Sequence, residues 1–448
     1  MRDTVGMAET LFPLPAPVER PAQPGAPVAR PIPRVVLPNR AQVELRPVNL
    51  EALLPEDHPA RAVWEFVAGL DLGPLYEEVE SVEGHAGRPA TDPRIHMALW
   101  LYATVEGVGS ARAIERLTHQ HDAYRWICGG VQVNHHSLAD FRVKHVEFLD
   151  SVLTGSVATL MAEGLVSLNR VAQDGIRVRA NAGAASFRRK ETLEQCLEEA
   201  KEQVEALRKE LEDDEAATSR RQAAARRRAA EARRQRVAAA LAQMPEVEAK
   251  KGPTDKDKAR VSTTDPDARV MKMADGGFRP AYNGQISVDT QSQVVVGVDV
   301  SNSGSDQGKL RPMTAQIRER YDVVPKQTLA DGGFAGLQDI EATTELGSTV
   351  YAPVAKPKDP NRDPHQPLPT DSPAISDWRT RMGTTEAKEI YKDRAATVEC
   401  FNAIARNRGL QRFLVRGLTK VRAVLLWFAV AHNMMRTLAL RAAQTQAA

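Results

Sequence analysis

Cysteine and aromatic residues are scarce in this chain. Three cysteines occur among 448 residues, Cys128, Cys196 and Cys400, and no two of them form a C-x-x-C pair. The spacing argues against a cysteine zinc site, a redox motif or a disulfide scaffold, and favours a reduced, cytoplasmic protein. Aromatic residues make up only 5% of the chain, so we expect an aliphatic core.

Long apolar runs are also lacking. The longest, Ala423 to Ala431, is much shorter than the roughly 20 residues that span a bilayer as a helix. The N-terminus shows no basic segment followed by an apolar run, as a secretory signal would. We therefore expect no membrane partner, and a buried helix between Arg422 and His432.

Neither a strong charge excess nor a phosphate-binding loop is present. The 60 basic and 58 acidic residues give a net charge of +2, and that balance leaves an anionic partner undecided because charges cluster locally. The pattern G-x-x-x-x-G-K-[ST] does not occur, so we expect no nucleotide cofactor. The length and the apolar fraction of 42% fit a globular protein of two or three domains.

Proline is abundant in the first forty residues, which predicts a disordered tail over residues 1–53. Residues 54–165 have helical spacing of apolar side chains. Asp92-Pro93 is typical of a helix start, and Ser110 and Ser137 are candidate helix caps.

The helical region is rich in basic side chains, which include Arg112 and Arg142. They suggest a DNA-binding domain with a helix-turn-helix-like surface. A structural helical domain whose arginines are merely solvated explains the pattern equally well.

The apolar period changes from Asn169 onward, and strands begin to alternate with helices. We expect an α/β core, a mixed sheet flanked by helices, from residues 166–186 and 270–440, followed by a tail over 441–448. The predicted strands contain Val171–Val178, Gln285–Asp289, Val294–Val300, Gln327–Ala330 and Thr349–Val354; the predicted helices are Gln307–Arg320 and Thr385–Leu440; Lys356–Asp377 is a predicted loop.

An insertion over residues 187–269 interrupts this core. Its first half is acidic and carries apolar residues at heptad spacing, which predicts a helical coiled coil. Its second half, Arg220 to Arg236, is arginine-rich and could fold back on the first as an antiparallel hairpin. One long solvated helix, or an arm that binds phosphates, are the alternatives. The heptad residues are Leu193, Leu197, Ala200, Val204, Leu207 and Leu211.

Three acids stand out by their context. Asp174 interrupts an apolar strand, Asp331 ends another, and Glu399 lies on a predicted helix. An aspartate followed by glycine often only caps a turn. Three carboxylates from separate elements repel one another when buried together, whereas a pair of divalent cations would make such a cluster favourable.

The order of these acids, and of the sequence blocks listed below, resembles the order found in the RNase H-like DDE transposases of bacterial insertion sequences. One branch of these transposases has a helical N-terminal domain. The similarity extends over most of the chain. The blocks are Gly87-Arg88-Pro89-Ala90, Trp100-Leu101-Tyr102, Gly109-Ser110-Ala111-Arg112, Leu138-Ala139-Asp140-Phe141-Arg142, Asp174-Gly175, Ala330-Asp331-Gly332-Gly333-Phe334, Tyr391 to Glu399, and Arg406 to His432-Asn433.

The block around Glu399 is similar to the Y-R-E-K signature of that group, with Tyr391, Arg394, Glu399 and Arg406 at the four positions. It departs from the signature twice. Four residues, rather than three, separate Arg394 from Glu399, and arginine replaces lysine at Arg406. Arginine still supplies a cation for a phosphate, with different hydrogen-bond geometry.

The resemblance implies an enzyme that cleaves DNA at the terminal inverted repeats of its element and joins the freed 3′-OH to target DNA. Asp174, Asp331 and Glu399 would be the catalytic residues and hold two Mg²⁺ ions, with Mn²⁺ as a substitute. Tyr391, Arg394, Arg406, Arg112 and Arg142 would bind double-stranded DNA, within a homo-oligomer that is a dimer or larger.

Two alternatives stay open at this point. One is an inactive DNA-binding relative, or an RNase H-like nuclease without strand transfer. The other is a helical regulatory protein that binds DNA without Mg²⁺ and dimerises through the coiled coil.

Overall fold

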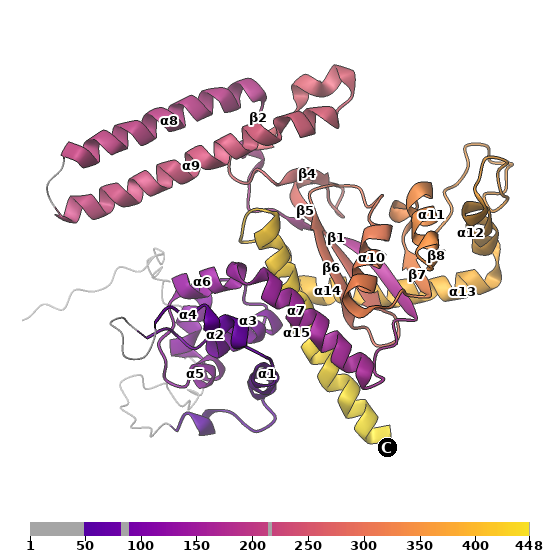
Figure 1. Cartoon of the computed structure of the whole chain (residues 1–448), viewed down its shortest axis with the longest axis horizontal. Helices are drawn as coiled ribbons and strands as arrows, with labels where there is room; N and C mark the ends of the chain where they lie inside the picture. The colour runs from indigo at the N-terminus through magenta and orange to yellow at the C-terminus, as the bar shows by residue number, and fades with distance from the viewer. Residues whose placement is uncertain (1–48, 82–88, 214–216, 448) are drawn as a thin grey trace, which may run out of the picture. The chain divides into compact units, whose positions relative to one another are not determined.

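The computed structural model describes residues 49–81, 89–213 and 217–447. Most of the tail predicted over residues 1–53 lies outside these ranges, and Glu51–Leu53 forms a short 3-10 turn. The described chain comprises N-terminal helices, a helical hairpin and an α/β region (Figure 1).

The N-terminal region is helical, as predicted, and its caps explain where the helices begin. Asp92 accepts a hydrogen bond from the Arg94 amide, and Ser110 accepts one from the Ala113 amide. The prediction that Ser137 caps a helix is wrong. Asn134, an equally good capping residue, accepts from the Ser137 amide instead. The helices are α1 (Pro59–Ala68), α2 (Gly73–Glu77), α3 (Pro93–Val105), α4 (Ala111–Gln120), α5 (Asp122–Cys128), α6 (His135–Lys144) and α7 (Val146–Ala162).

Six strands of the described chain form one mixed sheet. β1 pairs antiparallel with β5 and parallel with β7; β5 also pairs antiparallel with β4 and β6, and β7 parallel with β8. With the helices beside it, this sheet is consistent with an RNase H-like core. The strands are β1 (Arg170–Arg179), β4 (Arg269–Lys272), β5 (Phe278–Asp289), β6 (Val295–Ser301), β7 (Gln327–Ala330) and β8 (Thr349–Tyr351).

The helices of this region follow the prediction with three differences. Helix α11 (Leu337–Glu345) is not among the predicted helices. The expected loop ends early, because α12 begins at Pro373, and proline suits the first turn of a helix. The expected helical stretch Thr385–Leu440 is interrupted between Asn407 and Leu418. The helices are α10 (Leu310–Tyr321), α11 (Leu337–Glu345), α12 (Pro373–Gly383), α13 (Thr385–Arg394), α14 (Cys400–Asn407) and α15 (Leu418–Ala447).

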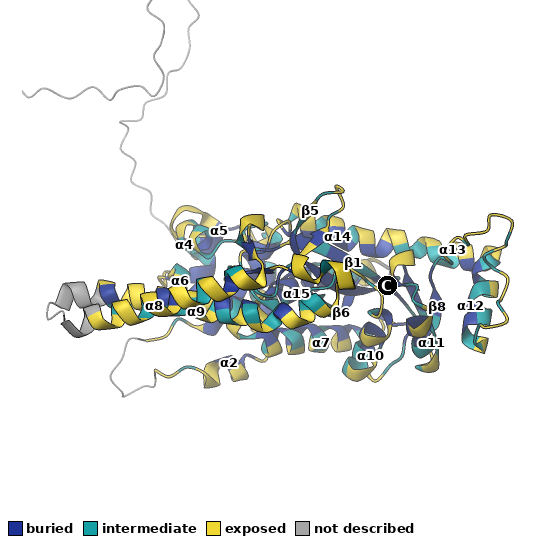
Figure 2. Ribbon diagram, turned by 90° about the horizontal axis from the view of Figure 1, so that it is seen from above, coloured by how far each residue is buried: buried dark blue, intermediate teal, exposed yellow. Residues whose placement is uncertain are grey.

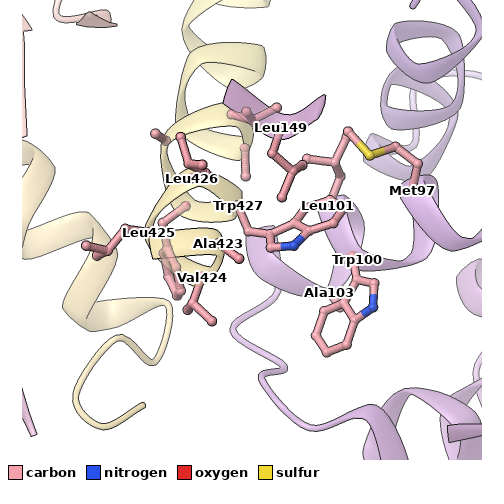
Figure 3. Packing of buried hydrophobic residues seen from close by; sticks show 14 of the residues in the cluster. Met97, Trp100, Leu101, Ala103, Leu149, Ala423, Val424, Leu425, Leu426 and Trp427 are labelled. Carbon is pink, nitrogen blue, oxygen red and sulfur yellow. The ribbon is translucent and has the colours of Figure 1, made fainter. Parts of the chain in front are cut away.

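Helix α15 is the central helix of the largest hydrophobic cluster. Figure 3 shows Trp427 and Ala423 of α15 facing Trp100 and Leu101 of α3. Residues 423–431 are all buried, so the prediction of a buried helix is confirmed. α15 is long and apolar enough to cross a membrane by length and composition, but 67% of its most apolar window is buried inside the protein.

The insertion forms a helical hairpin. α8 (Lys190–Asp213) and α9 (Ala217–Ala249) lie side by side (Figure 1). Of the heptad residues, Leu193 and Ala200 are fully buried, while their neighbours on α8 are largely exposed (Figure 2). Arg233 of α9 pairs with Glu199 of α8 at 3.6 Å. The described part of the insertion is thus a hairpin with acidic and basic partners, and the coiled coil stays a prediction. The side chain of Leu211 lies outside the described residues.

Candidate active site

The first two acids lie side by side because of the strand register. β1 and β7 run parallel, with Gln173 opposite Ala330. Asp174 and Asp331 each follow one member of this pair, so they are adjacent across the two segments. β7 ends at Ala330, whereas β1 continues to Arg179. Both aspartates therefore lie at the end of β7, where β1 loses its parallel partner.

Each aspartate also organises its own backbone. Asp331 Oδ1 accepts a hydrogen bond from the Gly333 amide at 2.8 Å and begins the 3-10 turn Gly332–Phe334. Asp174 Oδ1 accepts from the Gly175 amide at 2.9 Å. Asp174 and Gly175 lie within the continuous strand β1, so the turn explanation for an Asp-Gly pair is correct only for Asp331. It does not exclude a second role, because Asp331 Oδ2 faces the guanidinium of Arg394.

Glu399 reaches the same place through an irregular helix. A π-helical turn, Ala395–Glu399, joins α13 to α14. In a regular α-helix, residues five apart point about 140° apart, because each residue turns the chain by 100°. The π turn accommodates one more residue per turn, and Arg394 Nη1 lies 3.5 Å from Glu399 Oε1. The extra residue between Arg394 and Glu399 is absorbed by this turn.

The guanidinium of Arg394 lies among all three carboxylates. Its Nη2 atom is 3.2 Å from Asp174 Oδ1 and 3.9 Å from Asp331 Oδ2, and its Nη1 atom contacts Glu399. The Arg394 side chain is 12% exposed, against 62% for Glu399. The structure therefore brings the three predicted acids together around one cation.

Asp174 is the most buried of the three acids. Burial raises the pKa of its carboxyl, the charge of Arg394 opposes that rise, and the nearby charge of Asp331 adds to it. Asn402 of α14 donates a hydrogen bond from Nδ2 to Asp174 Oδ2 at 3.1 Å. Asn402 Oδ1 is buried and has no hydrogen-bond partner among the described residues.

A fourth acid, Asp306, lies beside the site and was missed by the sequence analysis. Asn283 and Gln285 of β5 donate to its Oδ1 at 2.6 and 2.9 Å, and Arg177 of β1 lies 3.4 Å from its Oδ2. A Cβ atom at Gly175 would be 2.5 Å from Asp306 Oδ1, so a side chain at this position would displace the Asp306 carboxylate. No local pattern marks Asp306, because all these partners are distant in the chain.

The other residues of the signature lie near the acids. Tyr391 of α13 is half-buried against the cluster that contains Val398 and Leu329, and burial raises the pKa of its hydroxyl. Arg406 of α14 is exposed and lines one open cavity with Asp174, Asp306 and Asp331. A phosphate in that cavity would meet a cation beside the acids.

The two arginines predicted in the N-terminal region differ in exposure. Arg112 is exposed on α4, and its contact with DNA stays a prediction. Arg142 is buried; its guanidinium lies 4.7 Å from the centre of the Trp100 ring and donates to the Gly109 carbonyl at 2.8 Å. These contacts give Arg142 a structural role inside the protein, and its contact with DNA stays a prediction.

The carboxylates have the chemistry of a divalent-metal site, since Mg²⁺ prefers carboxylate oxygens. As arranged here, no three Asp, Glu, His or Cys side chains of the described residues are close enough to share one ion, and Arg394 lies between the acids. The types of donor nevertheless suit such a metal, since three carboxylates surround Arg394 and the unpartnered Asn402 Oδ1 belongs to the amide that contacts Asp174.

Comparison with known proteins gives two family matches. Residues 48–144 match a model described as "Transposase domain (DUF772)", and residues 248–434 match a model described as "Transposase DDE domain". The second range contains Asp331 and Glu399, while Asp174 lies in neither range and joins them through the sheet. No curated protein and no solved structure matches the chain.

Proposed function

The chain belongs to the DDE transposases and carries an N-terminal transposase domain, and from this we propose that it cleaves and joins DNA at the terminal inverted repeats of its own mobile element. The DDE family generally uses divalent metal ions. The observation that carries the proposal is the convergence of Asp174, Asp331 and Glu399 on one cation.

Asp174, Asp331 and Glu399 would hold the divalent ions. Two such ions, when bound, activate an attacking oxygen and stabilise the leaving oxygen of an in-line displacement at phosphorus. Asn402 holds the Asp174 carboxylate in one orientation. The β1–β7 register holds the backbones of the two aspartates together.

The reaction would proceed in two displacements at phosphorus. Water first attacks the phosphodiester at the end of the element; the new P–O bond replaces the bond to the 3′ oxygen, which leaves as a free 3′-OH. That hydroxyl then attacks a phosphodiester of the target, and the displaced target oxygen leaves. Arg406, and Arg112 on the N-terminal helices, would bind phosphates along the DNA. Two ends must react together, which favours a homo-oligomer.

The test is cleavage of linear DNA that carries the inverted repeats flanking the coding region, with and without Mg²⁺. We expect Asp174→Asn, Asp331→Asn and Glu399→Gln each to reduce cleavage by roughly 1000-fold or more, since members of a cooperating catalytic set fail together. Glu389→Gln is the matched control, because Glu389 is an exposed acid of α13 that pairs with Lys392.

Cleavage that survives all three substitutions would overturn the proposal. Mg²⁺-independent binding of the DNA, without cleavage by the unaltered chain, would favour a regulatory DNA-binding protein. Cleavage without joining to a target would favour a nuclease that lacks strand transfer.

A further inference from the structure

The contacts of Arg394 are shared rather than paired. Ion pairs between arginine and a carboxylate usually have N–O distances of about 2.7–2.9 Å, and Arg379 meets Asp371 at 2.7 Å in this protein. Arg394 lies 3.2, 3.5 and 3.9 Å from its three acids. Its Nε atom is buried without a hydrogen-bond partner in the described chain. The guanidinium thus occupies the centre of the acid cluster without a close bond to any member.

This position is the one that a metal would need. A Mg²⁺ ion binds carboxylate oxygens at about 2.0–2.1 Å with octahedral geometry, and the Arg394 guanidinium stands between the oxygens that would approach it. The single positive charge of arginine offsets only part of the charge of three carboxylates. A divalent cation supplies more charge at shorter distance, so the two cations compete for the same oxygens.

We propose that Arg394 is a positioning residue that holds Asp174, Asp331 and Glu399 together in the metal-free protein, and that its guanidinium leaves the acids when divalent metal binds. The inference rests on the proposed function, because it takes the three acids as the metal ligands. Once released, Arg394 is free to pair with a DNA phosphate in the cavity that Arg406 lines. The arginine therefore links metal loading to the availability of a DNA-binding cation.

The π turn is what gives one arginine access to all three acids. Arg394 directly precedes this turn and Glu399 ends it, whereas Asp174 and Asp331 come from the sheet. A change in the conformation of this turn would move Arg394 and Glu399 relative to each other, because the two residues lie at its ends. The two aspartates would stay in place, because they belong to the sheet.

The test measures Mn²⁺ binding to the full chain without DNA, by calorimetry and by the electron paramagnetic resonance signal of free Mn²⁺. We expect Arg394→Gln to bind Mn²⁺ about tenfold more tightly than the unaltered chain, within the usual range for coupling between two ligands. Arg394→Lys keeps the positive charge but cannot contact all three acids at once. Its Mn²⁺ affinity should therefore lie between that of the unaltered chain and that of Arg394→Gln. Lys392→Gln is the charge-matched control, because Lys392 is an exposed cation of α13 that pairs with Glu389.

Thermal melting provides the second measurement. Arg394→Gln should melt at lower temperature than the unaltered chain without Mn²⁺ and should gain more from added Mn²⁺. Equal or weaker Mn²⁺ binding by Arg394→Gln, or an equal gain for Lys392→Gln, would overturn this inference and leave the proposed function standing. If the folded, unaltered chain and Arg394→Gln both fail to bind Mn²⁺, the proposed metal site itself is refuted. If Arg394→Gln does not fold, Arg394→Lys decides the matter by the same comparison.

Discussion

At the scale of single residues, burial decides what each arginine does. Arg112, Arg142 and Arg394 look alike in the sequence as basic residues near helices, but only Arg112 is exposed. Arg142 is enclosed by Trp100 and the Gly109 carbonyl, and Arg394 by three acids. An arginine that neutralises or caps groups inside the protein is not available to DNA while it does so.

We predict that Arg142→Ala destabilises the fold by about 2–3 kcal/mol. The substitution removes a stacked cation and leaves a carbonyl without its donor, and these losses cost roughly 1 and 1–3 kcal/mol. Urea unfolding of the full chain measures the effect.

Arg112→Ala is the control for this prediction. Its unfolding free energy should change by less than about 0.5 kcal/mol, because surface substitutions seldom cost more, while DNA binding weakens and becomes less dependent on salt. Equal stabilities for the two variants would show that Arg142 has no structural role.

At the scale of elements, helix geometry accommodates a spacing that departs from the family signature. A regular helix with four residues between Arg394 and Glu399 would turn Glu399 away from the guanidinium. The π turn Ala395–Glu399 corrects this within one turn, so that α13 and α14 keep their own packing on either side. The extra residue between Arg394 and Glu399 is thus accommodated within the π turn.

We predict that deletion of Ala396 is tolerated. The deletion restores three residues between the arginine and the glutamate, and a regular α-helical turn can then replace the π turn without rotating α14. The melting temperature should stay within about 3 °C, which corresponds to roughly 1 kcal/mol, and DNA cleavage should persist.

Deletion of Ala403, an exposed alanine within regular α14, is the comparison. It rotates Asn402 by about 100° relative to Ala405, although both are buried, so we expect a much larger loss of stability. Similar losses for the two deletions would mean that the π turn is not an insertion that the helix absorbs.

At the scale of the whole molecule, one C-terminal helix connects regions that are distant in the sequence. The cluster around α15 contains residues of α3 and α7 as well as Ile176 of β1 and Ile286 of β5. Trp427 Nε1 donates to the Arg142 carbonyl at 3.0 Å. Burial shared by both regions should make them unfold together.

Asp150 of α7 tests this connection. Its Oδ1 accepts from Arg320 of α10 at 2.6 Å and from Arg422 of α15 at 2.9 Å, and the Arg320 side chain is only 7% exposed. Asp150→Asn should lower the unfolding free energy by about 2 kcal/mol, because it leaves two arginines without their anion. The loss would be larger if the ion pairs were fully buried.

Glu163→Gln, at the end of the same helix, is the matched control. Glu163 pairs with Arg441, whose side chain is 51% exposed, so its loss should cost less than about 1 kcal/mol. Both variants should still unfold in one transition by calorimetry and tryptophan fluorescence. Separate transitions for the N-terminal helices and the sheet would contradict a shared core.

Much of the fold could be predicted from local patterns. Apolar periodicity predicted β1, β6, β7 and α10 and the buried stretch in α15. Each of these patterns lies within one element and reflects the repeat of that helix or strand. Asp92 and Ser110 were recognised as caps for the same reason. The cap at Asn134, the early start of α12 and the break after Asn407 depend on competition between neighbouring residues, and the pattern did not resolve them.

The sequence by itself determined the identity and order of Asp174, Asp331 and Glu399, since each of them lies in a short local motif that resembles a motif of a known family. Only the tertiary structure decided what surrounds them. The β1–β7 register, the π turn, the guanidinium of Arg394 and the placement of Asp306 each join residues far apart in the chain or depend on a non-standard helix. Such contacts leave no periodic signal in the sequence, because they are fixed by how the elements pack on one another.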